Sequence, residues 1–422
     1  MTTAPTEDRT GTDRSAGSGA AGPRGKGVDY PTFDSDNHYY EATDAYTRHM
    51  DPTMAKRAMQ WAEINGRRRL LVGGTVNRFI PNPAFDPVAL PGSLDEYFRG
   101  RNPKAQDIRA LFGELEPIRP EYRDRDARLA VMDTQGLDGC FLFPTLGVGM
   151  EEALAHDPAA LVAAFGAFNR WLEDDWGYAY RGRIFAAPMI TLVDVEAAVA
   201  ELTRVLEHDA RLVCIKGGPA RTPSGLTSPA DRRFDPFWAL VNESGVAVGI
   251  HSGDAGYGRY VNDWEPYGSL EAFRHSPLRS VISSDRPPFE TMAALVCQGL
   301  FDRFPNVRVA SIEAGAEWVP ALVKKLAKAY GQMPSSFASD PVETFRRHVW
   351  VAPFYEDDLA GLKEVLGIER LLFGSDWPHA EGLAEPTAFA WDLRRHHFDE
   401  DEIRTVMQEN GRLLTTRVTR TA

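Results

Sequence analysis

The chain has 422 residues, of which 43% are hydrophobic and 25% charged, and this composition is ordinary for a globular protein. Its formal net charge of −13 argues against nucleic acid or a membrane surface as a partner, because both are negatively charged. A small anionic substrate is compatible with this charge, since a metal ion can reverse the field inside a pocket.

The three cysteines do not predict a disulfide framework. Cys140, Cys214 and Cys297 are far apart and each lies in an apolar run, which is typical of buried thiols in a reducing compartment. No segment has the apolar core of a secretory signal or the length of a membrane span, so we expect a cytoplasmic protein. Residues 1–28 consist mainly of Gly, Ser, Thr, Pro and charged residues and predict a disordered tail.

Short segments rich in β-forming residues follow this tail. Most of them lack internal charge, as expected of strands that are covered on both faces. The predicted strands are residues 32–36, 139–144, 183–190, 211–217, 245–251, 306–313, 348–354 and 370–376.

Longer amphipathic stretches lie between these strands and predict helices. The first opens with Asp157 and Pro158, a helix start signal, and the third ends at Gly245. The predicted helices span residues 157–180, 194–208, 235–245, 316–330, 356–367 and 400–414.

This alternation predicts an α/β fold, a closed (β/α)₈ TIM barrel over residues 29–415. A doubly wound open sheet is the runner-up, but no glycine-rich phosphate loop follows the first strand. Residues 40–125 interrupt the pattern with Arg, Pro, Asn and Gly. We interpret them as an insertion after the first strand, part loop and part helix, that covers the barrel mouth.

Charged and imidazole side chains gather at the ends of four predicted strands. Asp36 and His38 follow the first strand and project to the same side, while His251, Glu313 and Asp376 follow the fifth, sixth and eighth. In a barrel these positions meet at one end. Two imidazoles and two carboxylates there would make a divalent metal site with open positions, although each residue alone is also compatible with a turn or a cap.

A resemblance supports this interpretation. The segments DNHYYE (36–41), GIHSGD (249–254), GLFDRFPNVRVASIEAGAEWVP (299–320) and LLFGSDWPHAEG (371–382) resemble the amidohydrolase-related family. They are most similar to the branch with aminocarboxymuconate-semialdehyde decarboxylase and the hydroxybenzoate decarboxylases. The resemblance extends in order over about residues 30–415.

The resemblance implies one divalent ion, Zn²⁺ or Mn²⁺, held by Asp36, His38, His251 and Asp376. Two positions depart from the family. Better-known members have His or Glu where this chain has Asp36, and several have His where this chain has Glu313. Other amidohydrolases hold two metals with a carboxylated lysine after the fourth strand, and Lys216 lies at that place. Because this chain resembles the branch that binds one metal, we do not expect Lys216 to be a ligand. Relatives are often homodimers, so a homodimer is also expected.

The expected function is a metal-dependent decarboxylase of a small aromatic or unsaturated acid. Asp376, directly or through His379, would deliver a proton to the carbon that loses CO₂, and Glu313 would act as a base or orient a neighbour. The loop after the fifth strand offers residues for substrate binding. They are Arg259 and Arg286 as anchors for a second acid group, and Tyr257 and Trp264 among the aromatic residues (with Tyr39, Tyr40, Phe79, Tyr260 and Tyr267) that would wall a pocket.

Three alternatives stay open at this point. The same metal would support hydrolysis of an ester, lactone or amide, with Asp376 accepting the proton of the attacking water. It would also support non-hydrolytic cyclisation of a natural-product intermediate. Finally, the chain could be a non-catalytic barrel that binds a small molecule, and stoichiometric metal in the purified protein would argue against that.

Overall fold

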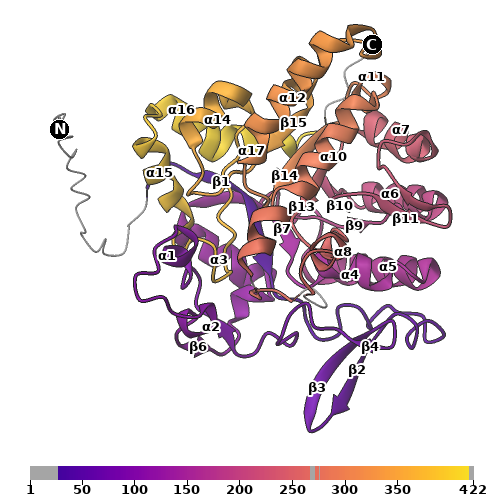
Figure 1. The fold of residues 1–422 in the computed structure, drawn as a ribbon. Helices are drawn as coiled ribbons and strands as arrows, with labels where there is room; N and C mark the ends of the chain where they lie inside the picture. Colours follow the sequence, from indigo (N-terminus) through magenta and orange to yellow (C-terminus); the bar gives the residue numbers. More distant parts are fainter. Residues whose placement is uncertain (1–26, 267–270, 275, 418–422) are drawn as a thin grey trace, which may run out of the picture.

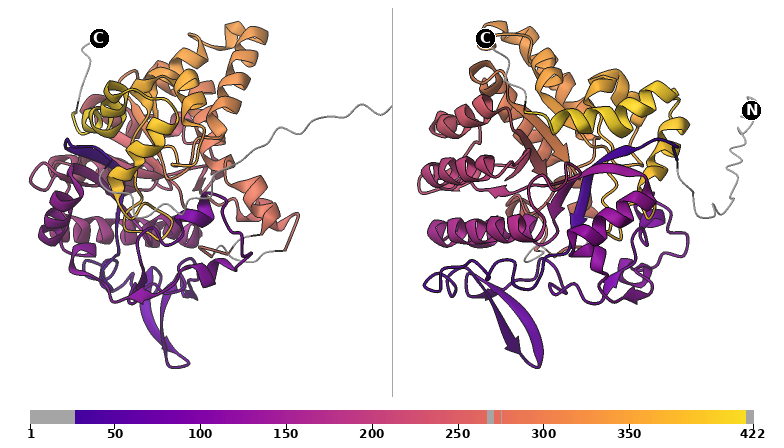
Figure 2. Two further views of the ribbon diagram at one scale, coloured as in Figure 1. Left: turned by 90° about the vertical axis from the view of Figure 1, so that its left-hand side faces the viewer. Right: turned by 180° about the vertical axis from the view of Figure 1, so that it is seen from behind.

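The computed structural model describes residues 27–266, 271–274 and 276–417 (Figures 1 and 2). Most of the predicted disordered tail lies outside the described residues. Its last two residues are ordered, because Gly27 is buried against Thr387 and Ala390 and its carbonyl accepts a hydrogen bond from Arg394 (2.6 Å).

Parallel strands form two sheets that together surround one core. One sheet has the order β1-β7-β8 and the other β15-β14-β13-β10-β9, and all pairings within them are parallel. The strands are β1 (Thr32–Tyr39), β7 (Leu137–Pro144), β8 (Ile184–Ala186), β9 (Met189–Ile190), β10 (Leu212–Lys216), β13 (Ala247–His251), β14 (Arg308–Ile312) and β15 (Val349–Val351).

The third predicted strand, residues 183–190, bridges the two sheets. It is interrupted between β8 and β9, but its backbone continues the hydrogen bonding on both sides. Ala187 N donates to Leu142 O of β7 (2.9 Å), and Pro188 O accepts from Cys214 N of β10 (2.8 Å). One edge of the ring is therefore closed.

The eighth predicted strand is irregular and closes the other edge. Leu372 N donates to Val351 O of β15 (2.8 Å), while Phe373 O accepts from Ser35 N of β1 (2.7 Å). Trp377 O accepts from His38 N (2.8 Å) at the far end of β1. The segment from 371 to 377 thus fills the gap between β15 and β1, and the predicted (β/α)₈ barrel is confirmed.

A helix follows each strand position and packs on the outside of the ring (Figure 1). The helix caps agree with the sequence: Asp157 accepts from Ala160 N and Asp194 from Ala197 N. These outer helices are α3 (Arg125–Gln135), α5 (Pro158–Asp175), α6 (Val195–Glu207), α7 (Asp235–Ser244), α10 (Arg286–Cys297), α12 (Trp318–Gln332), α14 (Leu359–Leu366), and the run α16 (Glu400–Arg404), η7 (Thr405–Glu409) and α17 (Asn410–Leu414).

Some predicted boundaries are wrong for local reasons. Helix α14 begins at Leu359 rather than 356 because the Asp358 carboxylate accepts from Gly361 N and caps it. Helix α5 ends at Asp175, before Gly177, whose φ of 72° is left-handed. Helix α10 was not expected, and two short helices, α8 (Gly258–Asn262) and α9 (Pro277–Ser283), lie in the segment predicted to be a loop.

Residues 40–124 form the insertion between β1 and α3. It contains α1 (Asp95–Phe98), α2 (Ile108–Leu111), a small sheet of β2 (Met59–Ile64), β3 (Arg67–Val72) and β4 (Thr75–Val76), and the pair β5 (Val88–Ala89) and β6 (Leu115–Glu116). These antiparallel strands were not predicted. The hairpin β2–β3 projects from the body (Figures 1 and 2) and turns at Asn65–Gly66, which both have positive φ.

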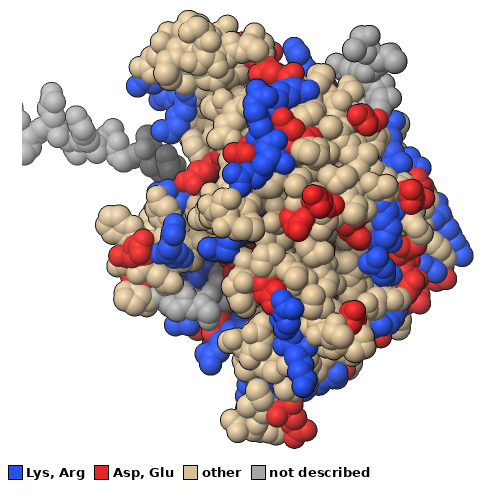
Figure 3. Space-filling model, turned by 90° about the vertical axis from the view of Figure 1, so that its right-hand side faces the viewer, with Lys and Arg blue, Asp and Glu red and all other residues tan. Residues whose placement is uncertain are grey.

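The surface carries mixed charge. On the face shown in Figure 3, basic and acidic side chains lie among one another rather than in separate areas. Within the described parts of the chain, no helix combines the length and apolar character that a membrane crossing requires. Cys140 and Cys214 are buried as expected, but Cys297 is exposed on α10, so the prediction of three buried thiols is wrong for this one.

Candidate metal centre

Five polar side chains converge at the carboxyl end of the barrel. Asp36 and His38 come from β1, His251 ends β13, Glu313 directly follows β14, and Asp376 lies in the eighth segment. His38 and His251 are almost fully buried, with 1% of each side chain exposed, whereas 23% of Glu313 is exposed. Positions far apart in the sequence are therefore brought together by the closure of the barrel.

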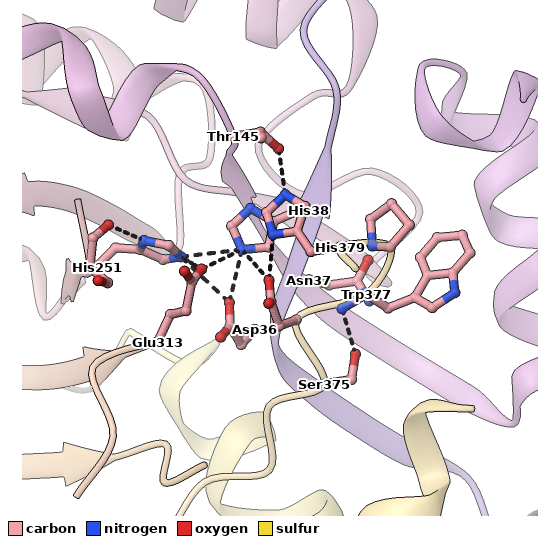
Figure 4. A network of polar contacts seen from close by, with 12 residues as sticks. Asp36, Asn37, His38, Thr145, His251, Glu313, Ser375, Trp377 and His379 are labelled. Carbon is pink, nitrogen blue, oxygen red and sulfur yellow. Dashed lines mark hydrogen bonds and ion pairs between the residues drawn. The ribbon is translucent and has the colours of Figure 1, made fainter. Parts of the chain in front are cut away.

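The donor atoms lie within a few ångströms of one another (Figure 4). The two imidazole Nε2 atoms, of His38 and His251, are 3.3 Å apart. Three carboxylate oxygens surround His38 Nε2, at 3.3 Å (Asp36 Oδ1), 3.1 Å (Glu313 Oε2) and 3.3 Å (Asp376 Oδ1). Two of them also lie near His251 Nε2, at 3.5 Å (Asp36 Oδ1) and 3.2 Å (Glu313 Oε2).

These spacings fit a divalent cation. Nitrogen and oxygen ligands lie about 2.0–2.2 Å from Zn²⁺, so the ligand atoms of a tetrahedral site are about 3.3–3.6 Å apart. In addition, Asp36 Oδ1 and Glu313 Oε2 are buried and have no hydrogen-bond partner among the described residues. A bound cation would satisfy these acceptors, which are otherwise costly to bury.

The electrostatics point the same way. Burial raises the pKa of Asp376 well above its usual range, and the nearby carboxylates of Glu313 and Glu381 raise it further. Burial lowers the pKa of His251, but Glu313 and Asp36 outweigh this effect and raise it to about 10. The cluster thus holds more negative than positive charge, and it binds protons to compensate. A dication would supply the missing positive charge.

Two of the five residues have strained backbones. Glu313 has a φ of 49° and Asp376 a φ of 56°, both in the left-handed region that side chains other than Gly rarely adopt. Such conformations cost about 1–3 kcal/mol and are typical of functional sites. This backbone conformation places the Glu313 carboxylate beside both histidines and the Asp376 carboxylate beside His38.

A chain of hydrogen bonds leads away from Asp376. The Thr145 hydroxyl donates to Tyr39 O (2.8 Å), so its oxygen must accept from His379 Nε2, which lies 2.8 Å away. His379 Nδ1 is then the acceptor and receives the proton of Asp376 Oδ1 at 2.5 Å. This assignment agrees with the pKa directions, since burial and the His38 imidazole lower the pKa of His379 well below its usual value.

The residues that hold this site in place were not assigned a role from the sequence. The buried Asp34 carboxylate accepts from Ser375 Oγ (2.5 Å) and Asn37 Nδ2 (2.8 Å), which ties β1 to the eighth segment. Arg128 of α3 donates to Asn37 Oδ1 (2.5 Å) and to His38 O (2.7 Å). Alternation along β1 places Asp34 two residues before Asp36 and could have revealed it. No local pattern indicates Arg128.

Lys216 has a different partner from the one that a two-metal site would need. Its ammonium group forms an ion pair with Glu152 and donates to Pro219 O (3.1 Å). Neither group of potential metal ligands in the described structure includes it.

The sequence profile of the amidohydrolase family matches residues 107–414. The chain belongs to the amidohydrolase family. The match spans seven of the eight barrel strand positions and includes His251, Glu313 and Asp376, so the family assignment covers most of the centre just described.

Three proteins are similar to this amidohydrolase in sequence or in fold. A crystal structure of an amidohydrolase from Mycobacterium avium subsp. paratuberculosis K-10 is 43% identical, with a TM-score of 0.87 over 92% of this chain and 100% of that one. Gamma-resorcylate decarboxylase of Rhodococcus jostii (strain RHA1) is 25% identical over 269 residues, 60% of this chain and 77% of the relative. A dihydroxybenzoic acid decarboxylase from Polaromonas sp. JS666, with bound manganese and 2-nitroresorcinol, is 16% identical and has a TM-score of 0.57 over 92% of this chain and 97% of that one, which shows a common fold.

A large cavity of about 1140 Å³ lies over the centre of this amidohydrolase. His38, His251, Glu313 and His379 line it, together with Glu381. Of the aromatic residues expected around a pocket, Tyr40 and Phe79 also line it. Tyr39 is buried in the core, and Tyr267 lies outside the described residues.

The four residues predicted to bind substrate are not in this lining. Arg286 begins α10 instead of lying in a loop, stacks on Tyr260 (4.5 Å) and pairs with Glu290 (3.2 Å). Tyr257 donates to the same Glu290 (2.6 Å) and is not part of the cavity lining.

The other two residues of that prediction, Arg259 and Trp264, are exposed, and 74% of Trp264 is accessible. None of the four lines the cavity, and their role in substrate binding stays a prediction. Two other arginines, Arg109 and Arg279, line the cavity.

Proposed function

We propose that this protein is a metal-dependent decarboxylase of an aromatic carboxylic acid. The observation that carries the proposal is the cluster of two imidazoles and three carboxylates at the floor of a largely apolar cavity. The similarity to gamma-resorcylate decarboxylase supports this choice of reaction, and manganese in the Polaromonas relative supports a divalent ion.

Asp36, His38, His251 and Asp376 would hold the ion, either Zn²⁺ or Mn²⁺. Glu313 completes the donor set on the side of the cavity, because it is the most exposed of the five and lines the cavity wall. When bound, the ion supplies Lewis-acid stabilisation for the substrate carboxylate and a neighbouring oxygen.

The proton would come from the pair of Asp376 and His379. Decarboxylation breaks the bond between the ring carbon and the carboxylate, releases CO₂, and requires one proton at that carbon. Asp376 Oδ1 and His379 Nδ1 lie 2.5 Å apart, and His379 lines the cavity. Because a carboxylate that holds the ion is ionised, the proton between them would then lie on His379 Nδ1. Thr145 holds the imidazole in place from its other nitrogen, so the ring is fixed for proton delivery.

The cavity wall suits an aromatic substrate. Aromatic side chains such as Tyr40, Phe79 and Phe85 form part of its wall and suit the flat face of an aromatic ring. The insertion contributes these residues, so we propose that it belongs to the same functional domain as the barrel, over residues 29–415. A homodimer and a cytoplasmic location stay predictions.

A screen of aromatic acids with added Mn²⁺ or Zn²⁺ tests the proposal. The protein should release CO₂ from at least one hydroxybenzoate and contain about one metal ion per chain. His251→Ala and Asp376→Asn should lose both. Release of acid from esters or lactones without CO₂ would instead indicate the hydrolase alternative, and absence of stoichiometric metal would indicate a non-catalytic barrel.

A further inference from the structure

The cavity is larger than the proposed chemistry needs. Its volume of about 1140 Å³ lies above the range of about 300–1,000 Å³ that is typical of ligand pockets. A one-ring hydroxybenzoate with its carboxylate at the metal cluster would occupy only the floor. The remaining apolar space would stay filled with water, which is unfavourable for a binding site.

The outer part of this space has apolar walls that are built from two separate segments. Phe112 from the insertion packs edge-on against Phe273, which precedes α9, with ring centroids 4.9 Å apart. The backbone joins the same two segments, because Ala272 N donates to Phe79 O (2.7 Å). Both rings and Phe79 line the cavity. The outer wall is therefore formed by packed side chains and a backbone hydrogen bond, and it continues the wall of the metal site.

Positive charge occurs away from the floor. Arg109 on α2 is exposed and Arg279 on α9 is half-buried, whereas His38 at the floor is 1% exposed, so the arginines lie at the outer end. The Arg109 side chain makes no ion pair or hydrogen bond with another described residue. Glu271 is a carboxylate of the outer wall, and it pairs with Arg274 at 3.9 Å.

We infer that the natural substrate is an aromatic acid with an apolar extension that ends in a second anionic group. Arg109 and Arg279 bind this far anion, which is a carboxylate or a phosphate, while the reacting carboxylate lies at the metal cluster. The inference rests on the proposed function for the reacting end only. It assigns to these two arginines the role that the sequence had suggested for Arg259 and Arg286.

The test uses 2,6-dihydroxybenzoate and three derivatives with an alkyl chain that ends in methyl, carboxylate or phosphate. The carboxylate- or phosphate-ended probe should exceed the methyl-ended probe in kcat/KM by about tenfold, since a charged hydrogen bond to a guanidinium supplies this much. Arg109→Met and Arg279→Met should each reduce this ratio towards one. Arg101→Met is the matched control, because Arg101 pairs with the exposed Glu96 and does not line the cavity.

A binding measurement separates this inference from the proposed reaction. Resorcinol derivatives with the same chains cannot be decarboxylated, and their affinities can be determined by titration calorimetry. Preference for the anionic chain without CO₂ release from any probe would support the inference and refute the reaction. CO₂ release from the unsubstituted ring with no gain from an anionic chain, in either assay, would overturn the inference and leave the reaction standing.

Discussion

The carboxyl end of the barrel and the insertion that follows β1 are built in different ways. Asp36 and His38 are fixed by backbone hydrogen bonds to the eighth segment and by the buried Asp34. The hairpin β2–β3, by contrast, projects from the body, and its turn residues Asn65 and Gly66 are exposed. The comparison teaches that the donor cluster lies where many strands constrain each side chain, while the insertion supplies part of the wall of the cavity above it.

The largest effect is expected at the barrel end. Asp376→Asn removes one donor of the cluster and should abolish stoichiometric metal binding. It should lower kcat/KM by about 1,000-fold or more, because Lewis-acid stabilisation supplies several kcal/mol and about 1.4 kcal/mol corresponds to a factor of ten. Elemental analysis and a CO₂ assay check this. Retention of metal and activity in the variant would refute the ligand set.

A smaller effect is expected where the insertion is anchored to the barrel. Arg99 after α1 makes two hydrogen bonds of 3.1 Å to Asp392 on α15 (Phe389–Arg395), and both side chains are buried. Arg99→Met removes the buried guanidinium that balances the charge of the Asp392 carboxylate. It should therefore lower the free energy of unfolding by about 3 kcal/mol. Denaturant unfolding measures it. The exposed pair of Arg101 and Glu96 is the control, and Arg101→Met should change stability by less than about 0.5 kcal/mol.

The next prediction concerns pH and a carboxylate beside the barrel strands. Burial raises the pKa of Asp357 to about 7, although Phe354 N donates to it and opposes this rise. The unfolded chain ionises near pH 4 and the folded protein only near pH 7. The folded state is therefore favoured below pH 4, and this contribution is lost as the pH rises to 7, by at most about 1.4 kcal/mol per unit.

Asp357→Asn should remove this dependence. Unfolding experiments between pH 4 and 8 should show a flatter profile for the variant than for the unchanged protein. Parallel profiles would mean that Asp357 is already ionised in the folded state.

The smallest effect is expected at the tip of the hairpin. Trp61 and Leu70 face each other in the β2–β3 register, so residues 62–69 can be replaced by Asn-Gly, which closes a two-residue turn. Because the removed residues are mostly exposed, the free energy of unfolding should change by less than about 0.5 kcal/mol and kcat/KM should be unchanged. If the unchanged protein were a dimer in solution and the variant a monomer, the hairpin would instead be shown to join two copies of the chain.

Part of the site could be predicted because strand ends in a barrel meet by geometry. The positions of Asp36, His38, His251 and Asp376 were chosen on that basis. The structure groups Asp36, His38 and His251 with Glu313, and it places Asp376 in a second, overlapping group with His38, Glu313 and His379. The surroundings of Arg286, one of the arginines predicted to bind substrate, were wrong for the opposite reason. Arg286 was assigned to a loop, but it begins α10, with Pro287 and Pro288 in the first turn, and its side chain pairs with Glu290 one turn further on. The insertion shows a missed signal, since Asn65–Gly66 is a strong indicator of a hairpin.

The sequence by itself determined the alternation of strands and helices, and with it the barrel and the places where its strands end. These features depend on local apolar patterns and caps, which each segment carries independently. Only the tertiary structure decided which groups support the centre and which line the cavity, as with Arg128 on His38 and Arg109 at the outer end. Such contacts join residues that are distant in the chain, so no local pattern of residues encodes them.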